Sequence, residues 1–211
     1  MSNSESNAAY LGNIQSLVTF EPALSKQERV DIQDVLLDAQ LFAGAKFNFE
    51  TQWSSWMHYY RNRLTSRGVK QRSVVTDDSL LLNNASELLS ATFAIKGISD
   101  HDVVGDLVRR SFEEMGIYQV SDAYFRYGSN STYVGSFQFV PCLRTENDQV
   151  VMSLCSLHLV SDPQSTGGRR LLFFFKGGSY VFDRQDYAAH RSDVERYLAG
   201  RSRSMIRAVE I

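Results

Sequence analysis

The sequence predicts an α+β fold in which N-terminal helices are followed by a five-stranded antiparallel meander and a C-terminal helix. Apolar residues recur at helical spacing up to about residue 116, and the spacing then becomes strand-like. Helical spacing returns after residue 186. Helices and strands that are segregated in this way are typical of α+β domains, so we expect the helices to pack mainly on one face of the sheet.

The composition is that of an ordinary globular protein. The 211 residues are 43% hydrophobic and 22% charged, with a net charge of −2. This length favours one domain, over residues 23–211, after a flexible N-terminal arm over residues 1–22. Within the arm, Leu17, Val18 and Phe20 are the residues that could dock it or add an edge strand.

Charge and hydropathy narrow the function classes. The near-neutral net charge favours neither a nucleic-acid coat nor a membrane-surface protein. The start of the chain lacks the basic-then-apolar order of a signal peptide, and no apolar run approaches the roughly 20 residues of a membrane span. We therefore expect a cytoplasmic protein with no membrane partner.

Two helices are predicted before residue 68. Ser25 and Glu28 have the spacing of a capping box, and the helix that follows is expected to stop near Gly44. The second helix is expected to begin near Asn48. Its apolar stripe is the strongest helical pattern in the chain and comprises Trp53, Trp56, Met57, Tyr60 and Leu64.

The middle of the chain gives weaker patterns. Residues 73–76 fit a short strand, and residues 80–82 fit either a strand or a helix. Two shorter helices are predicted over residues 87–95 and 99–115, where glycines follow the last apolar positions.

Five strands are predicted after Gly116, with short connections that favour antiparallel neighbours. They cover residues 118–127, 132–143, 150–160, 171–176 and 179–183. The last two are interpreted as a central β-hairpin that turns at Gly177-Gly178 and places Phe173 across from Phe182. A last helix is expected from Tyr187, and the tail over residues 200–211 either continues it or detaches.

The two cysteines are predicted to be free thiols. A turn centred on Asn147-Asp148 would place Cys142 opposite Ser153, so that Cys142 and Cys155 become diagonal neighbours on one sheet face. Diagonal neighbours are too far apart for a relaxed disulfide.

No catalytic, cofactor or metal site is predicted. Cys155 and His158 are three residues apart on a strand and should point to opposite faces. No histidine has a second His or Cys at metal-ligand spacing on its own element. The pair Asp186 and His190 is interpreted as a helix cap with a surface neighbour, and residues 167–170 (Gly-Gly-Arg-Arg) as a solvated loop.

Three function classes stay open. The first is a non-enzymatic interaction or assembly protein that contacts a protein partner or self-associates. The second is a nucleic-acid or polyanion-binding protein that uses the basic run after the aromatic stripe. The candidate polyanion contacts are Arg61, Arg63, Arg67, Lys70 and Arg72. The third is a small enzyme whose site is assembled from distant residues, such as Asp183 and His190.

Overall fold

The computed structural model describes residues 7–96, 102–129, 131–162 and 168–211, and it has an α+β fold. Its seven-stranded sheet has the order β3-β6-β5-β4-β2-β1-β7, in which β2 and β4 are parallel and the other neighbours are antiparallel. The strands are β1 Ala8–Leu11, β2 Ser16–Phe20, β3 Lys70–Leu82, β4 Tyr133–Arg144, β5 Val150–Ser161, β6 Leu171–Phe182 and β7 Ile206–Val209. The α+β class predicted from the sequence is confirmed.

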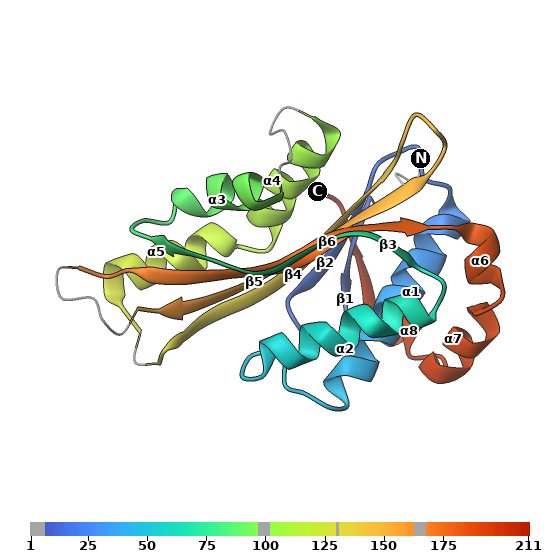
Figure 1. Ribbon diagram of the computed structural model, residues 1–211, viewed down its shortest axis with the longest axis horizontal. Coiled ribbons are helices and arrows are strands. Elements are labelled where there is room, and N and C mark those ends of the chain that lie inside the picture. The colour runs from blue at the N-terminus through green and yellow to red at the C-terminus, as the bar shows by residue number, and fades with distance from the viewer. Residues whose placement is uncertain (1–6, 97–101, 130, 163–167) are drawn as a thin grey trace.

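Helices cover both faces of the sheet, so the prediction that they lie mainly on one face is wrong (Figure 1). On one face lie α1 Lys26–Gly44, α2 Trp53–Ser66, α6 Arg184–Ala188 and α7 Arg191–Leu198, and on the other lie α3 Glu87–Lys96, α4 Val103–Glu114 and α5 Ile117–Tyr127. A short helix, α8 Ser202–Met205, leads into β7. The sheet therefore separates two apolar cores.

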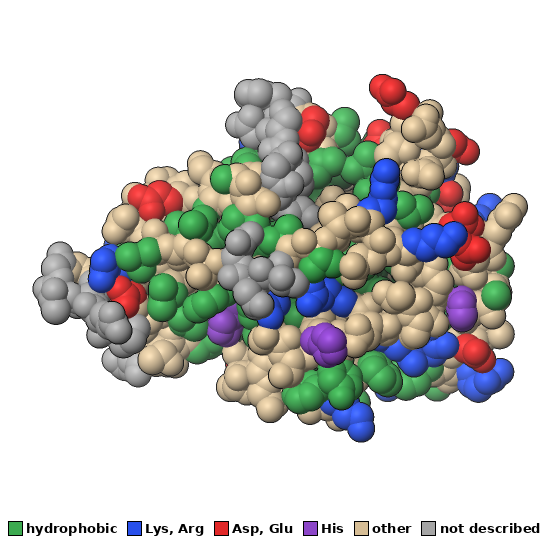
Figure 2. Space-filling model, viewed as in Figure 1, with side chains coloured by type: hydrophobic (Ala, Val, Ile, Leu, Met, Phe, Trp, Pro, Cys, Tyr) green, Lys and Arg blue, Asp and Glu red, His purple; other side chains and the backbone are tan. Residues whose placement is uncertain are grey.

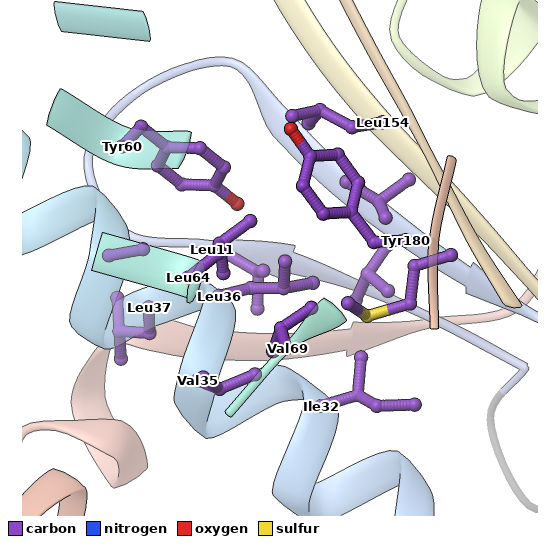
Figure 3. Close-up of a cluster of buried hydrophobic side chains, with 14 of the residues drawn as sticks. Leu11, Ile32, Val35, Leu36, Leu37, Tyr60, Leu64, Val69, Leu154 and Tyr180 are labelled. Carbon is purple, nitrogen blue, oxygen red and sulfur yellow. The ribbon is translucent and has the colours of Figure 1, made fainter. Parts of the chain in front are cut away.

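The first core confirms the two helical patterns of the N-terminal half. Ser25 accepts a hydrogen bond from the Glu28 backbone, and the Glu28 carboxylate accepts one from the Ser25 backbone, which completes the capping box. The aromatic stripe of α2 is buried, and Tyr60 is fully enclosed. Figure 3 shows residues of this core from α1, α2 and the sheet, among them Val35, Leu36, Leu37, Tyr60, Leu64, Leu154 and Tyr180.

The predicted hairpin at Gly177-Gly178 is a single straight strand, β6. A Cβ at Gly177 would lie 2.1 Å from the Leu154 carbonyl oxygen of β5, and one at Gly178 would lie 2.1 Å from the Ser73 carbonyl oxygen of β3. The glycines therefore permit close approach of both neighbouring strands and do not form a turn. Because side chains alternate along one strand, Phe173 enters the second core and Phe182 the first.

The expected five-stranded meander is reduced to β4, β5 and β6. Residues 118–127, predicted as a strand, form the helix α5, in which Ile117, Ser121 and Tyr124 are buried at helical spacing. Residues 70–82, of which only parts were predicted as strand, form the 13-residue β3. Gly116 has a φ of 64° and separates α4 from α5.

The ends of the chain also differ from the prediction. The flexible arm expected over residues 1–22 contains β1 and β2, and Leu17, Val18 and Phe20 of β2 are buried. The tail over residues 200–211, expected either to continue the last helix or to detach, contains β7, which pairs with β1 from Ala8↔Val209 to Leu11↔Ile206. The two ends of the chain thus complete the sheet by pairing with each other.

Cys142 and Cys155 are both buried and not joined in a disulfide, as predicted. They lie on opposite faces, however, because Cys142 pairs with Met152 and not with Ser153. A loop of residues 145–149, with Asp148 at a φ of 59°, moves the register by one residue from the expected one. A shift of one residue turns a side chain to the other face of a sheet.

Both thiols should be unreactive toward DTNB in the folded protein. Burial raises the pKa of the Cys142 thiol, so little reactive thiolate is present at neutral pH. We expect no release of the coloured product under native conditions and two equivalents, one for each of the 2 cysteines, in guanidinium chloride. Rapid reaction of either thiol in the native protein would contradict its placement in a core.

Candidate functional site

The strand β3 forms one outer edge of the sheet. It pairs with β6 on one side, and among the described residues no strand pairs with its other side. Val74, Leu80 and Leu81 of this strand are 38%, 40% and 41% exposed. A long edge strand with exposed apolar side chains is a template for pairing with another chain.

The sheet face beside this edge is only partly covered. Across β3, β6 and β5, Leu81 pairs with Leu172, and Leu172 pairs with Val160. Phe174 lies next to them on the same face and is also partly exposed. Helices α1 and α2 cover the other end of this face, and Figure 2 shows hydrophobic side chains at the surface where the strands extend beyond α2. We call Leu81, Val160, Leu172 and Phe174 the open sheet face.

A cavity of about 550 Å³ lies between the open sheet face and the start of α2. Its lining includes Trp53, Ser54, His158, Phe174 and Lys176. The Trp53 indole donates a hydrogen bond of 2.8 Å to the Ser156 hydroxyl, and the His158 ring stacks on it with centroids 5.3 Å apart. The Lys176 ammonium lies 5.5 Å from the centre of a Trp53 ring, within the range of cation–π attraction.

A second cavity, of about 750 Å³, has a separate set of lining residues. It is lined by Ser136 and Tyr133 of β4, and by Phe49, Met115 and Met205 from three other segments. Ser136 and His158 are cross-strand partners, and the distance between Ser136 Oγ and His158 Nδ1 is 2.7 Å. Thus Ser136 borders one cavity and His158 the other, and they are joined by a hydrogen bond.

Burial lowers the pKa of His158, because removal from water disfavours the charged imidazolium. The ring is therefore neutral at physiological pH and has one nitrogen able to accept a proton. The pair was not predicted from the sequence because Ser136 and His158 are 22 residues apart in the chain. With the register predicted from the sequence, Ser136 would have faced Leu159.

The basic residues predicted as polyanion contacts are divided between two places. Arg63 and Arg67 both bind the Asp38 carboxylate, at 2.6 and 3.3 Å, and that side chain is fully buried. One guanidinium nitrogen of Arg61 is also buried. Lys70 and Arg72 lie on β3, where Lys70 forms an ion pair with Asp186 and Arg72 is exposed.

The other residues considered as catalytic or anion-binding candidates lie at the ends of helices. Asp183 caps α6 by accepting hydrogen bonds from the backbone of Gln185 and Asp186, and His190 lies at the start of α7. Arg169 donates hydrogen bonds to the last carbonyl groups of α5. In the part of the chain that the structure describes, no group of three or more His, Cys, Asp or Glu residues could hold a metal ion.

The helices of the described segments include none with the length and apolar character needed to cross a membrane. The chain matches no protein-family model, and no curated protein matches its sequence.

Proposed function

We propose that this protein functions in assembly through protein–protein contacts, and that its partner at β3 is a second copy of the same chain. The observation that carries this proposal is the exposed outer edge of β3 with Leu80 and Leu81 at its C-terminal end. An added strand forms main-chain hydrogen bonds with such an edge and removes its apolar side chains from water.

The two halves of β3 differ in how the edge is protected. Register irregularities interrupt the strand between Gln71 and Ser73 and between Val75 and Asp78, and Lys70 and Arg72 add charge to the same half. Bulges and charged residues are the usual means by which edge strands resist pairing. Residues 79–82 carry no bulge, proline or charge, so this C-terminal segment of β3 supports addition of a strand.

Two copies can pair at this segment around a two-fold axis. Antiparallel pairing around a two-fold axis at Leu81 places Leu81 of one chain across from Leu81 of the other, and the same surface is used twice. Such an isologous contact closes a dimer and leaves no further edge for growth at this end. The open sheet face would then continue from one subunit into the other, and the net charge of −2 gives little repulsion.

Sedimentation velocity over a concentration series tests this dimer. We expect the protein to approach about twice its chain mass of 23.9 kDa as the concentration rises. Leu81→Lys should weaken the dimer by at least about tenfold, because the charge would have to be buried in the contact. The substitution is at an exposed position, so the fold should be retained.

Val103→Lys is the matched control. Val103 is 50% exposed on α4, away from the edge strand, and its replacement should leave the dimer unchanged. A parent protein that sediments as a monomer at every concentration would refute self-assembly. A dimer that resists Leu81→Lys would place the contact elsewhere.

Polyanion binding through Arg61, Arg63, Arg67, Lys70 and Arg72 is the alternative proposal. It has less support, because Arg63 and Arg67 are engaged with Asp38 and Lys70 with Asp186. Phosphate contacts need cations at the surface that release counterions on binding. Of the five residues, Arg72 has the clearest surface exposure without an ion pair described for it.

A further inference from the structure

We propose that Ser136 and His158 form a nucleophile–base pair that hydrolyses carboxylic esters with small apolar acyl groups. This activity is separate from the assembly proposed for β3. The proposal starts from the 2.7 Å distance between Ser136 Oγ and His158 Nδ1, which is the reach required for proton transfer between a nucleophile and its base.

The positions of the two side chains are set by the sheet. Ser136 and His158 are direct partners in the β4–β5 ladder, so backbone hydrogen bonds fix their separation. The His158 ring is held by Trp53, which stacks on it with an interplanar angle of 16°, and by the nearby rings of Tyr133 and Phe174. A base whose ring is already oriented loses little conformational freedom during reaction.

The protonation state suits a base. His158 is neutral at physiological pH, as its burial dictates, so one ring nitrogen carries a proton and the other does not. When the ring proton is on Nε2, Nδ1 accepts the hydrogen bond from the Ser136 hydroxyl. In this tautomer Nδ1 can take the Ser136 proton when the oxygen attacks.

The cavity of about 750 Å³ gives a substrate access to Ser136. Phe49, Met115 and Met205 provide apolar wall, which suits a short acyl chain. Tyr133 lines the same cavity as Ser136, and its hydroxyl is a group able to donate a hydrogen bond to a developing oxyanion.

The chemistry has two balanced steps. Ser136 Oγ bonds to the ester carbonyl carbon while its proton moves to His158 Nδ1, and the imidazolium then returns that proton to the departing alkoxide. This leaves an acyl-Ser136 ester and a free alcohol. In the second step His158 takes a proton from water, the hydroxide oxygen bonds to the acyl carbon, and Ser136 leaves with the proton as the carboxylic acid is released.

A fluorophosphonate probe tests the nucleophile directly, because it phosphonylates activated serines with loss of fluoride. We expect one adduct on the native protein, located by peptide mass spectrometry at Ser136, and hydrolysis of p-nitrophenyl butyrate with an initial burst. His158→Gln keeps a hydrogen-bonding side chain but removes the base. It should slow labelling by at least about 100-fold, the lower end of what a positioned base contributes.

Two controls keep the result decisive. Ser192 is an exposed serine of α7 that lines neither cavity, so Ser192→Ala should leave labelling unchanged. Heat-denatured parent protein should not be labelled, which shows dependence on the fold even if His158→Gln unfolds. Absence of an adduct at Ser136, equal labelling after denaturation, or full labelling of a folded His158→Gln variant would each overturn the proposal. None of these outcomes bears on the dimer, which is read from mass.

Discussion

Gly177→Ala is expected to destabilise the protein by about 3 kcal/mol, the upper part of the usual range for overpacking. The added methyl carbon would lie 2.1 Å from the Leu154 carbonyl oxygen in the neighbouring strand. That oxygen belongs to the backbone of a central strand and cannot turn aside as a side chain could. Relief therefore requires β5 and β6 to move apart in the middle of the sheet, which weakens the ladder on both sides.

Chemical denaturation measures this loss as a lower midpoint. Gly44→Ala is the control, because the nearest atom to its added carbon is 3.9 Å away and the residue is in the last turn of α1. Alanine has the higher helix propensity, so this variant should be neutral or slightly more stable. If Gly177→Ala were as stable as the parent protein, β6 would not pass between its neighbours as a straight strand.

Asp38→Ala is expected to cost about 3–5 kcal/mol, the range found when one partner of a buried ion pair is removed. The Asp38 carboxylate is fully buried and accepts hydrogen bonds from both Arg63 and Arg67. Without it, two guanidinium groups that are only 15% and 12% exposed lose their shared partner. Arg63 is also packed against Phe42 and Tyr197, so it cannot swing freely into water.

Asp106→Ala is the matched control for this ion pair. Asp106 binds Arg110 one helical turn away, and both side chains are about half exposed. Exposed pairs of this kind contribute little, so the change in unfolding free energy should stay within about 0.5 kcal/mol. Equal effects of the two substitutions would show that Asp38 does not hold α1 and α2 together.

Local sequence patterns were sufficient to predict the first two helices. The capping box and the stripe of α2 depend on residues three and four apart, and the helix itself brings such residues together. The α+β class followed from the same kind of periodicity. These features were predictable because the interacting groups are neighbours in the chain.

Longer-range pairing decided the sheet and the candidate sites. A Gly-Gly pair between apolar runs fits a turn or a crowded strand, and only the approach of β3 and β5 selects the strand. Residues near position 8 become strand because residues near position 209 pair with them. The contact between Ser136 and His158 exists in one register of β4 and β5 and disappears when that register moves by one residue. Sequence periodicity determines which side chains form the apolar face of a helix or strand. Strand partners and register depend instead on contacts between distant segments, and these contacts form only in the tertiary structure.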